Sequence, residues 1–181
     1  MSDKKKTAFV RLLVLGAGLA LFVSGAVPLV KHVYAAATAK VELDVTKAGP
    51  REVEDSTRNA IVRDYTQAWQ VMAAALANNT EGPLGQAFVG IARDKLAERV
   101  AAQAKSGLRA RIVDKGHALQ AVFYSPEGSA MQLHDVAKYE LQLLDGDDVV
   151  FSQEVQEKYI ALMTVAEGRW KVRVLEQVAD F

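Results

Sequence analysis

The chain has 181 residues, of which 50% are hydrophobic, and its 22 basic residues balance 22 acidic ones. It contains no cysteine, which excludes a disulfide scaffold, a zinc finger built on thiolates and a thiol nucleophile. This length and composition fit one folded domain with additional segments, and core-forming residues are too frequent for wholesale disorder.

The zero net charge conceals two regions of opposite sign. Residues 1–40 carry six basic residues and one acidic residue, whereas residues 41–181 carry 16 basic and 21 acidic residues. An acidic domain binds a phosphate backbone poorly, so nucleic acid is not an expected partner. The positive charge of the N-terminal region instead indicates membrane topology.

The first expected element spans a membrane. No residue from Leu12 to Val30 is charged, and a helix of about 20 apolar residues crosses a bilayer. Because basic residues precede this segment, the positive-inside rule keeps the N-terminus in the cytoplasm. We therefore predict a basic cytoplasmic tail over residues 1–11 and a transmembrane signal-anchor over residues 12–33. The lipid bilayer is then a partner, and the chain is a single-pass protein of the inner membrane whose C-terminal domain is extracytoplasmic.

A cleaved signal peptide is the alternative for the same segment. The run Ala35-Ala36-Ala37 offers the small residues of a cleavage site. The apolar run is longer than the roughly 7–15 residues of a usual signal peptide, which favours the anchor.

Polar residues 34–54 follow and are expected to form a linker or stalk. The alternation of Val41, Leu43 and Val45 within them also fits a short strand. Residues 55–181 are then the exported domain.

Two amphipathic helices are expected to open the exported domain. The first runs from Asp55 to Asn78 with Asp55 or Ser56 as its N-cap, and its apolar stripe consists of Ile61, Tyr65, Ala68, Trp69, Met72, Ala75 and Leu76. The second starts at Pro83 and ends before Gly107, a typical left-handed C-terminal cap. Its stripe consists of Leu84, Phe88, Ile91, Leu96 and Val100.

The rest of the chain has the pattern of strands joined by short turns. The expected strands are residues 108–113, 117–124, 130–144, 149–165 and 169–178. Since helices of this kind must cover an apolar surface, we predict an α+β fold. It has an N-terminal transmembrane helix, followed by two long helices packed on a curved antiparallel sheet of four to five strands.

This layout resembles a known superfamily. The closing strand, Gly168 to Val174, reads Gly-Arg-Trp-Lys-Val-Arg-Val, and Tyr65 and Trp69 lie on the stripe of the first helix. Helices followed by such a sheet resemble the nuclear transport factor two-like (cystatin-like) α+β roll. With the N-terminal anchor, the arrangement is similar to the bitopic scaffold of type IV secretion systems. The resemblance covers residues 55–178 and implies a roll that hosts enzymes, binders and scaffolds, with no family site residue carried over.

One acidic pair interrupts the apolar pattern of the strands. Asp135 lies on the otherwise apolar face of residues 131–143, and Glu157 interrupts the corresponding face of the next strand. If Leu143 faces Val149, Asp135 faces Glu157 inside the roll. Two facing carboxylates repel, so one of them tends to keep its proton and can act as a general acid or base or bind a cation.

A register shifted by one residue is the alternative at this point, because it places Asp135 opposite Lys158 as an ordinary ion pair. The first register makes Asp135 and Glu157 the candidate catalytic residues. Together with Tyr139 and Tyr159 they are also the candidate ligand-binding residues.

No metal or cofactor site is expected. His117 and His134 are interpreted as surface residues, and the histidine spacing matches no zinc motif. Two carboxylates alone supply too few ligands for a hard metal ion.

The remaining large and charged residues have structural interpretations. Trp69 and Trp170 lie at apolar positions of the helix and strand patterns and are expected in the core. Arg169, Lys171 and Arg173 alternate, which fits a solvated outer strand face, a protected sheet edge or a patch for an acidic partner.

Two functions are compatible with these features. The first is non-enzymatic: a single-pass, membrane-anchored extracytoplasmic domain acts as a protein-interaction or assembly module of the cell envelope and binds other envelope proteins or a second copy of itself. The alternative is a small-molecule-binding or isomerase/dehydratase-type roll that uses an interior carboxylate. The assembly module predicts a filled interior. The alternative predicts an open cavity with Asp135 in its wall, and drug-sized pockets measure about 300–1,000 Å³.

Overall fold

The computed structural model describes residues 39–181. The expected tail over residues 1–11, the signal-anchor over residues 12–33 and the alternative cleavage motif lie outside these residues. Within them, no helix combines the length and the apolar character that crossing a bilayer requires.

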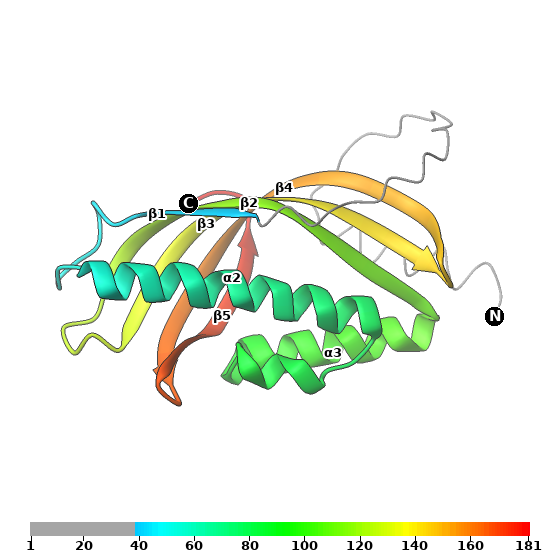
Figure 1. The fold of residues 1–181 in the computed structure, drawn as a ribbon, viewed down its shortest axis with the longest axis horizontal. Helices are drawn as coiled ribbons and strands as arrows, with labels where there is room; N and C mark the ends of the chain where they lie inside the picture. Colours follow the sequence, from blue (N-terminus) through cyan, green and yellow to red (C-terminus); the bar gives the residue numbers. More distant parts are fainter. Residues whose placement is uncertain (1–38) are drawn as a thin grey trace.

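The described residues form a five-stranded sheet with two helices on one of its faces (Figure 1). The elements are β1 (Lys40–Asp44), α2 (Asp55–Asn78), the 3-10 helix η1 (Gly82–Gln86), α3 (Gly90–Ser106), β2 (Leu108–Tyr124), β3 (Ala130–Asp145), β4 (Asp148–Ala166) and β5 (Arg169–Val178). The strands follow one another in chain order, with β1 parallel to β2 and all other pairs antiparallel. The α+β class is confirmed, but the sheet is mixed because its first strand is parallel.

Strand β1 comes from the segment that the sequence predicts as a linker. Its Leu43 is buried in the same core as the helices. A parallel pair needs a long crossover connection, which α2, η1 and α3 supply between β1 and β2. Further along, Pro50 forms an isolated bridge with Tyr124 at the end of β2, so this segment follows the sheet edge.

Helix α2 buries the whole predicted apolar stripe against the sheet. Its last turn is closed by Asn79 and that of α3 by Gly107, both with positive φ, so the predicted left-handed cap at Gly107 is confirmed. The prediction of an N-cap at Asp55 or Ser56 is wrong. Glu54 occupies that position in an extended conformation, and its side chain makes no capping hydrogen bond.

The second helix begins later than predicted. Pro83 lies in η1, and α3 starts only at Gly90. The reason is a strand-like contact in between, where the backbone N–H of Val89 donates to the carbonyl of Val172 at 3.0 Å. Gly90 then turns the chain with φ of +54°. Ile91 consequently leaves the predicted stripe and is 56% exposed.

Strand β2 is continuous where a turn was predicted. Lys115 is an extra residue between Asp114, which faces Tyr139, and Gly116, which faces Lys138. The Asp114 carboxylate accepts a hydrogen bond from the Gly116 backbone N–H at 3.1 Å. These turn-forming residues therefore build a β-bulge, and the bulge inverts the alternation of the strand that follows.

A second bulge sets the register of β3 against β4. Leu143 faces Phe151 and Leu144 faces Val149, so Val150 is the extra residue. From this bulge onward Asp135 faces Tyr159. Both predicted registers are therefore wrong at Asp135, which faces neither Glu157 nor Lys158.

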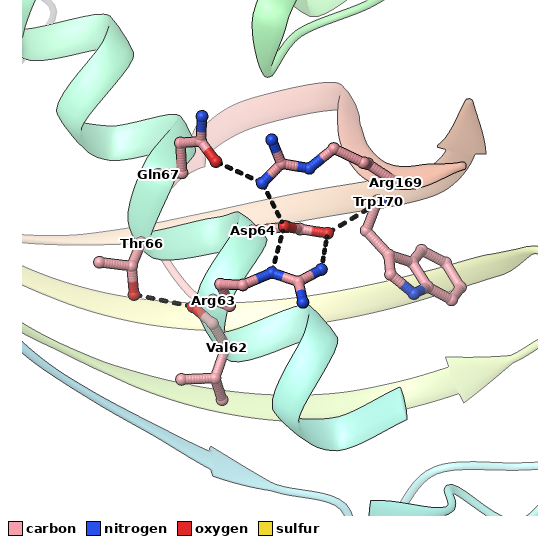
Figure 2. A network of polar contacts seen from close by, with 7 residues as sticks. All are labelled: Val62, Arg63, Asp64, Thr66, Gln67, Arg169 and Trp170. Carbon is pink, nitrogen blue, oxygen red and sulfur yellow. Dashed lines mark hydrogen bonds and ion pairs between the residues drawn. The ribbon is translucent and has the colours of Figure 1, made fainter. Parts of the chain in front are cut away.

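A buried carboxylate fastens α2 to β5 (Figure 2). Asp64 accepts hydrogen bonds from the Trp170 backbone N–H at 3.0 Å and from Arg169 at 2.9 Å. Arg63 donates to both of its oxygens, at 2.9 and 3.0 Å. Burial raises the pKa of Asp64, but the hydrogen bonds from Arg63, Arg169 and Trp170 outweigh it, so the pKa lies below its ordinary value.

The solvated face predicted for the basic residues of β5 holds only in part, because Arg169 and Arg173 are exposed whereas Lys171 is not. Arg169 is held by Asp64, and Lys171 is buried. The Lys171 ammonium donates to the carbonyl of Gly85 at 2.9 Å and to Glu167 at 2.7 Å. The prediction for the tryptophans is confirmed, since Trp69 and Trp170 are both in the core.

We predict that Asp64→Ala lowers the free energy of unfolding by about 1–3 kcal/mol, because the buried N–H of Trp170 loses its acceptor. Arg63→Ala is the matched control. Its side chain is largely exposed, so the loss of this ion pair costs about 0–1 kcal/mol. Urea unfolding of the full-length chain measures both values, and equal costs for the two variants would contradict this role of Asp64.

Candidate functional site

Asp135 lies at the centre of a buried polar cluster that joins three elements. Its Oδ2 accepts a hydrogen bond from the Tyr65 hydroxyl of α2 at 2.8 Å and another from Nδ1 of His117 on β2 at 2.8 Å. Nε2 of the same imidazole lies 3.2 Å from Asp114. Tyr65 and Asp135 are 0% exposed and His117 is 3% exposed. We call these four residues the Asp135 cluster.

The local sequence accounts for each member of the cluster. Tyr65 belongs to the apolar stripe that α2 turns toward the sheet. After the bulge at Lys115, His117 falls in phase with the buried Leu119 and therefore points inward. The interpretation of His117 as a surface residue is thus wrong, because the bulge reverses the faces of β2.

The two carboxylates around His117 determine its charge. Each ring nitrogen faces an acceptor, so both nitrogens act as donors only when the imidazole is doubly protonated. Burial lowers the pKa of His117, but the hydrogen bonds and charges of Asp114 and Asp135 outweigh it and raise the pKa to about 9. Burial, together with the charge of Asp135, raises the pKa of Tyr65 well above its ordinary value. The Tyr65 hydroxyl therefore stays protonated and donates its hydrogen bond to Asp135.

Trp69 connects the Asp135 cluster to the tyrosines. Its ring lies 4.4 Å from that of His117, 5.7 Å from that of Tyr139 and 5.6 Å from that of Tyr159, centroid to centroid. Among residues 39–181, the buried indole N–H of Trp69 and Oδ1 of Asp135 have no hydrogen-bond partner. Trp69 therefore joins the two groups through the contacts of its ring.

A cavity of about 220 Å³ lies beyond Trp69, between both helices and the sheet. Most of its wall is apolar and consists of Trp69, Met72, Ala92, Leu96, Ile112, Leu141 and Leu175. The polar part consists of Lys95, Arg99, Tyr139, Tyr159 and Gln177. The volume is below the range of about 300–1,000 Å³ that drug-sized ligands need, and Asp135 does not line it.

The four predicted site residues thus separate into two groups. Tyr139 and Tyr159 come together in the cavity wall, where their hydroxyl oxygens are 3.1 Å apart. Asp135 belongs to the buried cluster. Glu157 faces Ala137 at a partly exposed position and does not line the cavity. Burial is the main reason that the pKa of both tyrosines is raised, and the charge of Glu157 adds to it.

Sequence reasoning missed Tyr65, His117 and Arg99. A signal existed for the first two, since a carboxylate on an apolar face must find buried partners. Tyr65 was in the apolar stripe of a helix facing that strand. Arg99 had no comparable signal, because only the tertiary arrangement places it at the cavity.

A second hollow, of about 440 Å³, is open to the surface near η1 and is lined in part by Arg169 and Lys171. Both cations already bind acceptors of the fold, among them Asp64 and Glu167. In the described part of the chain, no group of side chains has the composition and spacing of a metal site.

Comparison with known proteins shows similarity in fold only. No family model matches the sequence, and no curated protein matches it either. The intermembrane space region of the chloroplast protein ARC6 superimposes with a TM-score of 0.61 at 15% identity, over 72% of this chain and 100% of that one. This likeness concerns the arrangement of helices and strands alone.

Two other solved structures match more loosely. Aln2 from a Streptomyces species has a TM-score of 0.45 at 10% identity, over 70% of this chain and 94% of that one. A putative calcium/calmodulin dependent protein kinase II association domain from Xanthomonas campestris has a TM-score of 0.43 at 12% identity, over 64% and 85% of the two chains.

The raised pKa of His117 predicts a pH-dependent stability. The pKa rises from 6.5 to about 9 on folding, so the stabilisation is complete below pH 6.5 and is lost as the pH approaches about 9. His117→Gln should therefore destabilise the full-length chain more at about pH 6 than at about pH 10.

Urea unfolding at the two pH values measures the difference. His134→Gln serves as the control, because His134 is partly exposed and stacks on Phe181 outside the cluster. The account of the cluster would be wrong if His117→Gln had the same cost at both pH values.

Proposed function

We propose that the chain is an assembly module of the cell envelope. In this proposal residues 12–33 anchor it in the inner membrane, and the α+β domain binds other envelope proteins on the extracytoplasmic side. The fold shared with the intermembrane space region of ARC6, a domain of an envelope compartment, supports this setting. The observation that carries the proposal is an open strand edge in the sheet.

The open edge belongs to the first half of β4. The whole of β3 pairs with β4, along residues Asp148 to Thr164 of β4. Strand β5 pairs with β4 only from Lys158 to Ala166. No other strand among residues 39–181 pairs with residues 148–157. Figure 1 shows β3 and β4 extending together beyond β5. We call residues 148–157 the β4 edge.

Strand addition is the recognition mode that such an edge offers. The outward backbone N–H and C=O groups of an edge strand bind an extended segment through main-chain hydrogen bonds. Natural edges are usually shielded by charge, proline or a covering element. Here Val149 and Val150 are 39% and 55% exposed at the start of the edge, so an added strand would also cover apolar surface.

The charge of the β4 edge defines the chemistry of its partner. Asp148, Glu154 and Glu157 are its charged residues, and it carries no lysine or arginine. Lys115 lies 3.7 Å from Glu154, which leaves the edge acidic overall. We infer that the partner is an extended basic segment of another envelope protein, because charge complementarity sets both the register and the rate of association.

The interior is not filled, although the assembly module predicted that it would be, because it holds the cavity of about 220 Å³. The position of Asp135 nevertheless favours this role over the enzymatic alternative. Asp135 is bound by Tyr65 and His117 and does not line the cavity. A general acid must be within hydrogen-bond reach of its substrate. The carboxylate on which the isomerase or dehydratase hypothesis depended is used instead to join α2 to the sheet.

Site-specific photo-crosslinking tests the β4 edge in intact cells. A photo-reactive residue at position 150 should form an adduct with a second protein, and Glu154→Lys should weaken this adduct because it removes the acidic charge. Position 91 is the matched control, since Ile91 of α3 is 56% exposed and Val150 is 55% exposed.

Three results would contradict the proposal. They are the absence of an adduct at position 150, adducts of equal yield at both positions, and an adduct that contains only two copies of this chain. The last would indicate self-association at this edge.

The anchor is tested separately. The full-length chain should remain in the membrane fraction after washing with high salt, because burial of an apolar helix is insensitive to screening. A chain without residues 1–33 should be released. Recovery of the full-length chain in the salt wash would contradict the anchoring of this domain.

A further inference from the structure

We propose that the 220 Å³ cavity between α2, α3 and the sheet binds a small amphipathic carboxylate, with its apolar body against Trp69 and its anionic head toward Arg99. This inference is independent of the β4 edge. It assigns a second binding function to the domain.

The size of the cavity sets the size of the ligand. An engineered apolar cavity of about 150 Å³ stays dry and binds benzene. The cavity here is larger at about 220 Å³, and its wall is mainly aliphatic and aromatic. It therefore accommodates a single ring or a short aliphatic chain that carries one polar group.

The charge at the cavity favours an anion. Lys95 and Arg99 both line it, and Lys95 is paired with Glu176 at 3.0 Å. Within residues 39–181, no carboxylate forms an ion pair with Arg99. A guanidinium binds a carboxylate with two parallel hydrogen bonds, so Arg99 is available to hold the head group.

The tyrosine pair adds a neutral donor. The hydroxyls of Tyr139 and Tyr159 are 3.1 Å apart, so one donates to the other. The accepting hydroxyl keeps its own hydrogen, and neither hydroxyl has another partner among the described residues. Because burial keeps both phenols protonated, this hydrogen can be donated to a ligand oxygen.

Glu157 provides an internal test of the sign of the charge. Its negative charge acts on both tyrosines, yet it does not line the cavity. An anionic ligand would be repelled by Glu157 and attracted by Arg99. The two substitutions Arg99→Gln and Glu157→Gln should therefore change anion binding in opposite directions.

Three probes with the same ring separate the possible head groups: benzoate, benzamide and benzylamine. The full-length chain, labelled with ¹⁵N in its indole groups, gives one signal from Trp69 in the cavity wall and one from Trp170 outside it. Benzoate should shift the Trp69 signal and leave that of Trp170 in place. Benzamide should bind more weakly, and benzylamine should not bind.

The variants test the contribution of each charge. Arg99→Gln should weaken benzoate binding by about tenfold, the size of one charged hydrogen bond. Glu157→Gln should strengthen it. Arg93→Gln, which removes an exposed arginine of the same helix that does not line the cavity, should have no effect. An unchanged Trp170 signal shows that each variant is folded.

The proposal is overturned if benzoate leaves Trp69 unaffected or if benzylamine is the preferred probe. It is also overturned if Arg99→Gln binds benzoate as tightly as the unaltered chain. None of these results bears on the crosslinks expected at the β4 edge, so the two proposals fail independently.

Discussion

Three elements of the fold meet at a single oxygen atom, Oδ2 of Asp135, which accepts hydrogen bonds from α2 and from β2 while its own residue belongs to β3. A buried carboxylate is costly unless charge and hydrogen bonds compensate it. The imidazolium of His117 supplies the charge and Tyr65 supplies a neutral donor. The long helix is thereby fixed over the centre of the sheet, while Asp64 fixes it to β5 at another point. Two buried acids thus hold α2 to the sheet at two points, in addition to the packing of its apolar stripe.

This arrangement also decides which part of the interior remains open. Trp69 packs on His117 and contributes to the cavity wall, so it lies between the Asp135 cluster and the cavity, whose wall contains no residue of the cluster. Asp135 itself is fully buried and is bound by Tyr65 and His117. The two surfaces to which we assign proposed functions are the cavity with its arginine and the acidic β4 edge.

Local features of this fold and the antiparallel order of its later strands were predictable from the sequence, whereas the residue-to-residue register between strands was not. The stripe of α2, the cap at Gly107 and the burial of both tryptophans follow from spacing within one element. The partner of Asp135 depended on single extra residues at Lys115 and Val150, and each bulge moves a whole strand to the opposite face or to a new register. Glu157 was therefore assigned to the wrong neighbour, and His117 to the wrong face. The tyrosine pair was identified as a candidate, although for a register that does not occur.

The charge of His117 is the most direct test of this account, because an imidazole between two carboxylates must donate from both nitrogens to satisfy them. The ¹⁵N chemical shifts of the ring nitrogens in the folded, full-length chain report this state. At about pH 7.5 an ordinary histidine is mostly neutral. The account predicts that both nitrogens of His117 carry a proton at that pH. A neutral imidazole with one unprotonated nitrogen would contradict it, because the contact between His117 and Asp135 would then lack the positive charge.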